Sequence, residues 1–294
     1  MWRGREKLSF MVTFACVVVV AAASSAAIGD ITTGLVGYWD FEEGAGSTAY
    51  DQSPNGNNGQ LSGGAWVGGV QGAPGVGTRQ DPPNFAVGLD GQNDVVTMSD
   101  SNHFNFGWGD FSISVWIKTE SRTAQEVINH HIYTSTLGTG YRIGLTPQGY
   151  ISAKIIDGED DDFALGSLDP VTDGVWHHLV MVRRGDTGEL YVDTELQPID
   201  VNALVGDTDV DDDLVLGYNR IGDPMWFDGA IDEVRLYNRA LNTDDVLVLF
   251  PEPAALCLLA VGGLLIGATR ESGLHSWKGR GTRALKSTSA WLTA

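Results

Sequence analysis

The stretch between Val175 and Asp193, VWHHLVMVRRGDTGELYVD, places the tightest limit on how this chain can fold. Its residues alternate with a period of two and are rich in β-branched and aromatic types, which is typical of a strand. Arg184–Gly188 then supplies the glycine and aspartate that tight turns favour, and Leu190 and Val192 share one face of the returning segment. The stretch therefore predicts a β-hairpin. The two faces expected for its first strand are Trp176, His178, Val180 and Val182, and His177, Leu179, Met181 and Arg183.

The rest of the central region repeats short strand patterns between glycine-rich turns. Phe85–Leu89 and Asp94–Met98 are expected to pair around Asp90-Gly91, and one short helix is expected at Thr243–Phe250, capped by Asn242 or Thr243. The near absence of helical periodicity predicts an all-β sandwich or jelly roll. The other expected strands are Leu35–Phe41, Phe111–Lys118, Glu126–His130, Tyr141–Leu145, Tyr150–Ile156, Leu214–Gly217 and Ala230–Tyr237.

Charge limits the class of partner. The formal net charge is −20, from 38 acidic and 18 basic residues, and the basic residues concentrate at the two ends of the chain. So acidic a central region repels phosphate backbones and attracts cations, which argues against nucleic acid as a partner. Both cysteines, Cys16 and Cys257, lie in apolar terminal segments, so no disulfide is expected in the central domain.

The N-terminal residues have the three parts of a secretory signal. Arg3, Arg5 and Lys7 precede the apolar run Leu8–Ala23, and small residues follow as far as Ala27. This order predicts a signal peptide over residues 1–27 and secretion across the inner membrane. An uncleaved membrane anchor is the alternative, which the small residues disfavour.

The C-terminal region carries a second targeting pattern. Pro251-Glu252-Pro253 is followed by the apolar run Ala254–Ala268 and by Arg270. Residues 251–270 resemble a PEP-CTERM sorting segment, and the resemblance implies an exosortase-type processing enzyme, contact with the membrane and a location at the cell surface or outside the cell. Such segments normally end soon after the basic residue, whereas this chain continues with a basic tail, residues 271–294, which is expected to be disordered or to come from a misassigned reading frame.

Four stretches of the central region carry a family resemblance. Beside the hairpin stand LVGYWDFEEGAG (Leu35–Gly46), FSISVWIK (Phe111–Lys118) and FDGAIDEVRLYNRAL (Phe227–Leu241). Together they resemble the laminin-G-like jelly-roll domains of the concanavalin A-like lectin/glucanase class over residues 28–250. The resemblance implies a jelly-roll sandwich of two antiparallel sheets, and it says little about activity because one sandwich hosts many functions.

Catalysis is not expected, although the class includes glucanases. Retaining glycosidases need two carboxyl groups about 5–5.5 Å apart, and the Glu-x-Asp-x-x-Glu pattern of the laminarinase-like enzymes is absent. Asp232 and Glu233 are adjacent and should point to opposite faces of a strand. The adjacent histidines His130-His131 and His177-His178 should likewise divide between two faces.

Calcium is the expected cofactor, because it binds carboxylate and carbonyl oxygens in loops. The resemblance to the wider sandwich class implies a structural calcium held by an aspartate of the last strand and by groups near the first strand. Asp232 and Asp51 are the matching candidates, with a hydrogen bond or an ion pair to Arg235 as the alternative role of Asp232. The acidic run Asp207–Asp213 lacks the glycine and the closing glutamate of a calcium loop, which favours a solvated loop.

Aromatic residues near loops are the candidate ligand contacts. Trp226, Tyr133 and Trp108 lie in or beside expected loops, where exposed rings can stack on sugars. Trp39, Trp116 and Trp176 are expected in the core. These observations favour a secreted, surface-associated, non-catalytic binding module for polysaccharide or another extracellular surface component. A structural or adhesive matrix protein without glycan binding is the alternative, and a glycoside hydrolase is the least favoured.

Overall fold

The computed structural model describes residues 31–70, 84–134, 137–157, 163–201, 206–219 and 225–250. The predicted signal peptide, the Pro-Glu-Pro segment with its apolar run, and the basic tail lie outside the described residues. No helix among the described residues has the length and apolar character needed to span a membrane.

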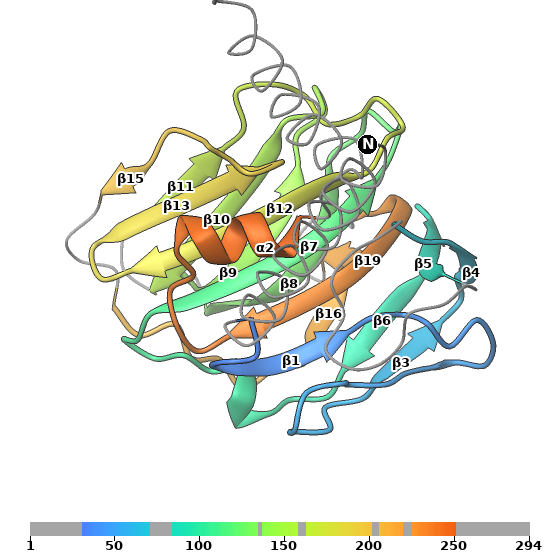
Figure 1. The fold of residues 1–294 in the computed structure, drawn as a ribbon, viewed down its shortest axis with the longest axis horizontal. Helices are drawn as coiled ribbons and strands as arrows, with labels where there is room; N and C mark the ends of the chain where they lie inside the picture. Colours follow the sequence, from blue (N-terminus) through green and yellow to red (C-terminus); the bar gives the residue numbers. More distant parts are fainter. Residues whose placement is uncertain are drawn as a thin grey trace, which may run out of the picture. The chain divides into compact units, whose positions relative to one another are not determined.

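The described part of the chain is a sandwich of two antiparallel sheets, as the strand pattern predicted (Figure 1). Nine described strands form the first sheet. Two of them, β1 and β15, lie outside the main strand order and pair with β19 and β13. Its strands are β14 (Glu195–Leu196), β13 (Thr187–Val192), β12 (His177–Arg184), β7 (Phe111–Lys118), β19 (Asp228–Tyr237), β5 (Phe85–Asp90), β4 (Ala65–Gly68), β1 (Leu35–Trp39) and β15 (Asp200–Val201).

The second sheet has eight described strands, and a short separate ribbon lies beside it. In spatial order the second sheet contains β11 (Phe163–Gly166), β10 (Ile151–Asp157), β9 (Leu137–Leu145), β8 (Gln125–Thr134), β16 (Leu214–Leu216), β6 (Val95–Met98), β3 (Gly59–Ser62) and β2 (Thr48–Ala49). The ribbon pairs β17 (Tyr218–Asn219) with β18 (Met225–Trp226), and a 3-10 helix, η1, spans Asn102–Phe104.

The central hairpin is confirmed, and both of its faces are buried. β12 and β13 are joined at Gly185-Asp186, and Leu179 and Met181 face the core between the sheets. Val180 and Val182 belong to a second cluster on the outer face. The alternating pattern had identified the two faces but could not show that the outer one is also covered.

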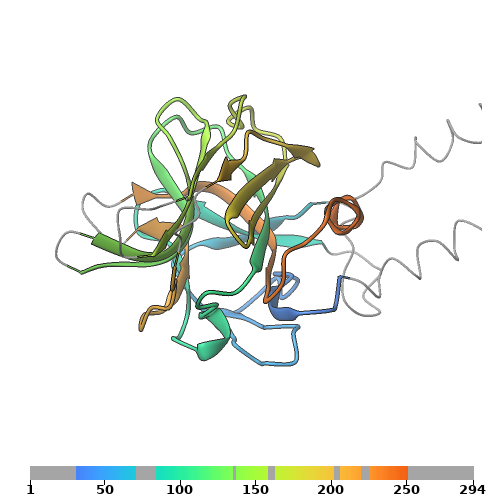
Figure 2. The ribbon, with the colours of Figure 1, turned by 90° about the vertical axis from the view of Figure 1, so that its left-hand side faces the viewer.

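The C-terminal helix supplies that cover. α2 (Thr243–Leu249) lies over the outer face of the nine-stranded sheet, on the side away from the eight-stranded sheet (Figure 2). Val246 and Leu249 of α2 pack in the second cluster with Val180 and Tyr237. Asn242, one of the two caps that the sequence allowed, caps the helix and forms a reciprocal capping box with Asp245.

One predicted strand pairing is wrong. Phe85–Leu89 and Asp94–Met98 do form strands, but β5 belongs to the nine-stranded sheet and β6 to the eight-stranded sheet. The Asp94 carboxylate accepts a hydrogen bond from the Asp90 N–H at 2.9 Å, within the turn that carries the chain between the sheets.

Trp176 also departs from its predicted core position: it is only partly buried, whereas Trp39 and Trp116 are buried.

Candidate functional site

Trp108 is the most exposed large apolar side chain among the described residues, at 74%. It lies in a tight turn just before β7, where the N–H of Gly109 donates to the carbonyl of Phe106 at 2.8 Å. Phe106 in turn stacks on Phe111 with ring centroids 4.6 Å apart. The turn is therefore anchored in the core while its indole faces solvent.

A second loop fastens this turn from the side. The N–H of Gly107 donates to Oδ1 of Asp209 at 2.6 Å, and the N–H of Thr208 donates to the carbonyl of Gly107 at 3.2 Å. Arg183 donates to the carbonyls of Gly107 and Gly206 at 3.1 and 2.8 Å. We call the surface formed by Gly107, Trp108, Gly206, Asp207 and Asp209 the Trp108 edge.

The Trp108 edge combines an exposed aromatic ring with carboxylate oxygens. A Cβ placed on Gly206 would lie 3.1 Å from the Trp108 ring, so the edge of the indole packs closely against this glycine. Asp207 and Asp209 are exposed next to it. An aromatic face stacks on apolar C–H surfaces, and carboxylates accept hydrogen bonds from hydroxyl groups. This pairing of groups suits a sugar ring.

The other two candidate aromatic residues are placed differently. Trp226 is half-buried in β18 and stacks on Tyr218, with ring centroids 4.0 Å apart and a 21° angle between the planes. Trp226 precedes the beginning of β19, and Ala230 of β19 pairs with Lys118 at the end of β7. Trp108, by contrast, precedes the beginning of β7. The length of β7 separates the two tryptophans by roughly 20 Å or more.

Tyr133 falls in β8 near its end, where Ile132 pairs with Thr139. Thr139 also pairs with Asp157 at the end of β10, and Asp157 accepts a hydrogen bond from the N–H of Gly206 at 2.7 Å. Tyr133 therefore belongs to the same end of the sandwich as the Trp108 edge, but its side chain lies outside the description.

Asp51, a calcium candidate, uses its carboxylate within its own loop. Oδ1 accepts hydrogen bonds from the N–H groups of Tyr38 and Ser53 at 2.9 and 2.8 Å. Oδ2 accepts from the N–H of Asn57 and the hydroxyl of Ser53, both at 2.8 Å. These bonds fix the loop after β1 against Tyr38.

Asp232, the other calcium candidate, is buried on the outer face of β19. Its Oδ2 accepts a hydrogen bond from the N–H of Val70, and its Oδ1 accepts from the N–H of Glu233, both at 2.8 Å. Burial, together with the nearby charges of Glu233 and Glu42, raises the pKa of Asp232 to about 9, although the two hydrogen bonds lower it. The hydrogen bonds from Val70 and Glu233 match the alternative role predicted for Asp232, and Arg235 forms an ion pair with Glu233.

The oxygen atoms around Asp232 fit a hard cation better than a transition metal. Oδ1 of Asn84 is buried without a hydrogen-bond partner among the described residues. A side chain built on Gly69 would lie 2.0 Å from that atom and 2.7 Å from Oδ2 of Asp232, so the two oxygens are near one another. No group of three or more His, Cys, Asp or Glu side chains among the described residues could hold a metal ion. A calcium ion here would therefore need amide, carbonyl or water oxygens as well.

The two calcium candidates do not share a hydrogen-bond partner. Asp51 binds the backbone and side chains of its own loop and of Tyr38, whereas Asp232 binds Val70 and Glu233. These contacts do not bring the two predicted ligands together at one position.

A buried Ser–His contact is the nearest approach to nucleophilic machinery in the described chain. The Ser114 hydroxyl lies 2.8 Å from Nε2 of His178, which stacks on Trp116. Ser114 and His178 are fully buried, and burial lowers the pKa of His178 to about 3. Substrate has no access to this hydroxyl, and the pair serves packing beneath α2.

Sequence reasoning identified Trp108 but missed its neighbours. Asp207 and Asp209 had been interpreted as part of a solvated loop, and Arg183 only as a strand residue. Asn84 and Glu42, near Asp232, carried no motif. The contacts of Gly107 with Arg183 and with Asp209 join residues 76 and 102 positions apart, so no local spacing could have shown them.

Comparisons with known proteins agree with this fold. The model of the family Laminin_G_3, described as the concanavalin A-like lectin/glucanases superfamily, matches residues 90–247. Adhesion G-protein coupled receptor V1 of Danio rerio is 25% identical over 161 residues, which are 53% of this chain and 3% of the receptor. The chain thus spans a small fraction of that curated relative.

Solved structures share the fold at low sequence identity. The binding domain of Paraclostridial Mosquitocidal Protein 1 aligns with a TM-score of 0.58 at 16% identity, covering 76% of this chain and 56% of that one. The binding domain of Botulinum Neurotoxin DC, solved in complex with SialylT, gives 0.52 at 16% identity, covering 75% and 52%. A structure of botulinum neurotoxin type C, whose cell entry is described as dependent on two ganglioside molecules, gives 0.54 at 16% identity, covering 76% and 52%.

The fold and the family match lead to one assignment. The match covers more than half of the chain and includes the central hairpin, the last strand and most of α2. This chain belongs to the Laminin_G_3 family of the concanavalin A-like lectin/glucanases superfamily.

Proposed function

We propose that this protein is a secreted, non-catalytic binding module that recognises polysaccharide or another glycan-bearing surface component through the Trp108 edge. The observation that carries the proposal is the 74% exposure of Trp108 on a turn that hydrogen bonds and core packing hold in place. An exposed indole costs free energy in water. An indole that is held rigidly beside hydrogen-bond acceptors can bind a sugar with little loss of side-chain entropy.

The comparisons support a binding role without defining the ligand. The binding domain of Botulinum Neurotoxin DC was solved in complex with SialylT, cell entry of botulinum neurotoxin type C is dependent on interaction with two ganglioside molecules, and the curated relative is an adhesion receptor. Because the sequence identities are low, these binding properties are stated only of those proteins. Secretion, exosortase-type processing and contact with the membrane through residues 251–270 remain proposals from the sequence, as does the cell-surface or extracellular location.

We further propose that calcium stabilises the module at Asp232. A carboxylate with a pKa of about 9 beside Glu42 and Glu233 is neutral at pH 7 unless a cation compensates its charge. The unpartnered Oδ1 of Asn84 and the acidic chain add oxygen ligands and attraction for a divalent ion. Calcium would thus act on stability, at a position separate from the Trp108 edge.

The glycan proposal is tested with the full-length chain on a panel of immobilised polysaccharides. We expect saturable binding to at least one glycan class, and a loss of about tenfold in affinity for Trp108→Ala, equivalent to ~1.4 kcal/mol. Tyr50→Ala is the matched control, because Tyr50 is also an exposed aromatic residue, at 54%, outside this edge. It should bind like the unaltered protein.

Two results would overturn the glycan proposal. Absence of saturable binding across the panel would favour the structural matrix role. Equal loss of binding in the two variants would show that the Trp108 edge is not the contact surface. Release of reducing sugar from any bound polysaccharide would contradict the non-catalytic assignment.

A further inference from the structure

A cavity of about 320 Å³ opens at the other end of the central hairpin, away from the Trp108 edge. Its walls come from the beginning of β12, from the turn between β13 and β14, and from the loop that follows β11. This volume is at the lower end of the range for small-molecule pockets. The cavity therefore suits one amino-acid side chain or one small residue of a larger partner, rather than an extended ligand.

The frame of the cavity is held by hydrogen bonds. Nδ1 of His177 lies 2.7 Å from Oδ2 of Asp193, and Oδ1 of Asp193 accepts the N–H of His178 at 2.8 Å. Opposite them, Oε1 of Gln197 accepts the N–H of Leu168 at 2.9 Å, which ties β14 to the loop after β11. These contacts fix the walls before any ligand arrives.

The polar groups that remain available are negatively charged. Asp169 and Glu195 line the cavity and are exposed, and neither carboxylate has a hydrogen bond or an ion pair among the described residues. Among the described residues, no lysine or arginine lines the cavity. His177, which also lines the cavity, is held between Asp193 and Asp173, with Nε2 3.1 Å from Asp173. The cavity thus favours a positively charged group.

The rim is apolar. Leu168 and Leu196, which flank the two free carboxylates in sequence, are 67% and 51% exposed, and Pro170, Val171 and Val192 form apolar parts of the wall. A long cationic side chain buries its methylene stem on such a surface while its charged head reaches a carboxylate. The described lining contains no Phe, Tyr or Trp, so it offers a sugar ring no aromatic stacking surface.

We propose that this cavity receives a lysine or arginine side chain of a partner protein, with Asp169 and Glu195 as the carboxylates that bind its charged head. The acidic chain as a whole draws basic partners towards it. The site does not depend on the glycan proposal, because it lies at the opposite end of β12 and shares no residue with the Trp108 edge.

The test uses the full-length chain and three short peptides that differ at one central position: lysine, acetyl-lysine and norleucine. Binding is measured by calorimetry and by chemical-shift changes at His177 and Leu196. We expect the lysine peptide to bind, and the two uncharged peptides to bind at least about tenfold more weakly. Asp169→Asn combined with Glu195→Gln should reduce lysine-peptide binding by a similar factor, and glycan binding should not change.

The matched control is Asp186→Asn combined with Asp244→Asn, which removes the same charge from exposed positions outside the cavity. If binding arose only from the overall negative charge, both double variants would lose affinity equally, and the proposal would fail. It would also fail if norleucine bound as well as lysine, if no peptide bound, or if glucosamine oligomers bound at the cavity more tightly than the lysine peptide.

Discussion

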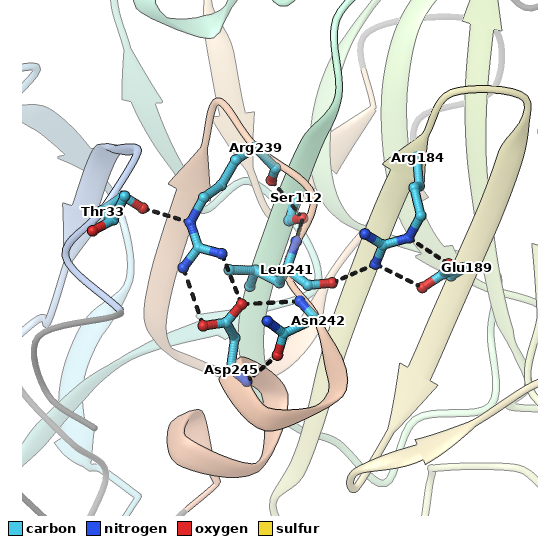
Figure 3. Close-up of polar contacts among 8 residues, drawn as sticks. All are labelled: Thr33, Ser112, Arg184, Glu189, Arg239, Leu241, Asn242 and Asp245. Atoms are coloured by element: carbon cyan, nitrogen blue, oxygen red, sulfur yellow. Dashed lines mark hydrogen bonds and ion pairs between the residues drawn. The ribbon is translucent and has the colours of Figure 1, made fainter. Parts of the chain in front are cut away.

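Arg239 and Asp245 form a two-pronged ion pair that joins the end of β19 to the first turn of α2, with N–O distances of 2.7 and 3.2 Å (Figure 3). Asp245 also accepts the N–H of Asn242, and Arg239 donates to the carbonyl of Thr33 at 2.7 Å. The Ser112 hydroxyl donates to the carbonyl of Arg239 and accepts the N–H of Leu241. These contacts hold α2 over the outer face of the sheet.

Asp245→Ala should lower the free energy of unfolding by about 1–2 kcal/mol, because it removes half of the capping box and a partly buried ion pair. The melting temperature should fall by about 2–4 °C for each kcal/mol. Asp244→Ala in the same turn is the control, since Asp244 is exposed and lies outside these contacts. Equal losses in both variants, measured by thermal unfolding, would contradict this role of Asp245.

The buried histidines should make the fold sensitive to acid. Burial lowers the pKa of His178 to about 3 and those of His130 and His131 to about 4, against 6.5 in the unfolded chain. The unfolded state then binds more protons than the folded state below pH 6.5, so this stability is lost as the pH falls from about 6.5 towards 4. Between pH 7 and pH 5, the free energy of unfolding of His178→Asn should fall by about 2 kcal/mol less than that of the unaltered protein, as measured by urea unfolding.

His177 provides the contrasting control. The hydrogen bond from His177 to Asp193 raises the pKa of His177, so its contribution is present below pH 6.5 and is lost as the pH rises through the raised pKa. His177→Asn should therefore steepen the loss of stability in acid. Identical pH profiles for the two histidine variants would show that burial does not set these pKa values.

Asp232→Asn should separate calcium binding from folding. With chelator at pH 7 the Asp232 carboxyl is protonated, since its pKa is about 9. The amide keeps one acceptor oxygen but sets its NH2 group against the N–H of Val70 or of Glu233, so we expect a loss of about 1–3 kcal/mol in the free energy of unfolding. Calcium at 100 times its Kd should stabilise the unaltered protein by ~2.7 kcal/mol and the variant much less. An equal calcium response in both proteins, read by differential scanning calorimetry, would place the ion elsewhere. Asp51→Asn tests the other predicted ligand in the same way.

The change in folding stability with pH that Asp232 causes provides a second test. Its raised pKa means that the folded state binds more protons than the unfolded state between about pH 4 and pH 9, so in chelator this carboxyl makes stability fall as the pH rises through that window. The fall should be smaller in Asp232→Asn, whose side chain does not titrate. A steeper fall in the variant would contradict the raised pKa.

Gly217 should tolerate no side chain. Its φ is +84°, and an added Cβ would lie 2.3 Å from Cδ1 of Leu89 in the core. Gly217→Ala should cost about 2–4 kcal/mol, from a left-handed backbone and an overpacked core. Gly56 has φ +69° with open space around it, so Gly56→Ala should cost about 1 kcal/mol through backbone strain alone. If chemical denaturation gave equal losses of unfolding free energy for Gly217→Ala and Gly56→Ala, the predicted overpacking at Gly217 would be contradicted.

The strands and the helix were largely predictable from local sequence. Phe111–Lys118 was predicted with the bounds that β7 has, and its alternating Phe111, Ile113, Val115 and Ile117 all face the core. The end of α2 was predicted to within one residue, and its cap is Asn242, one of the two residues expected there. Such features depend on side-chain alternation, turn chemistry and capping, which involve residues only a few positions apart.

Pairing and sites depended on the tertiary structure. The Asp90–Asp94 turn had the chemistry of a hairpin, yet it connects two sheets, because the partners of β5 and β6 lie elsewhere in the chain. Trp108 acquired its carboxylate neighbours from a loop about 100 residues away, and the cavity beside His177 joins three separate segments. The sequence by itself determined which segments are strands and which faces are apolar, because these follow from local alternation. Only the tertiary structure decided which strands pair, which polar groups are buried and which meet at a surface, because those depend on contacts between distant segments.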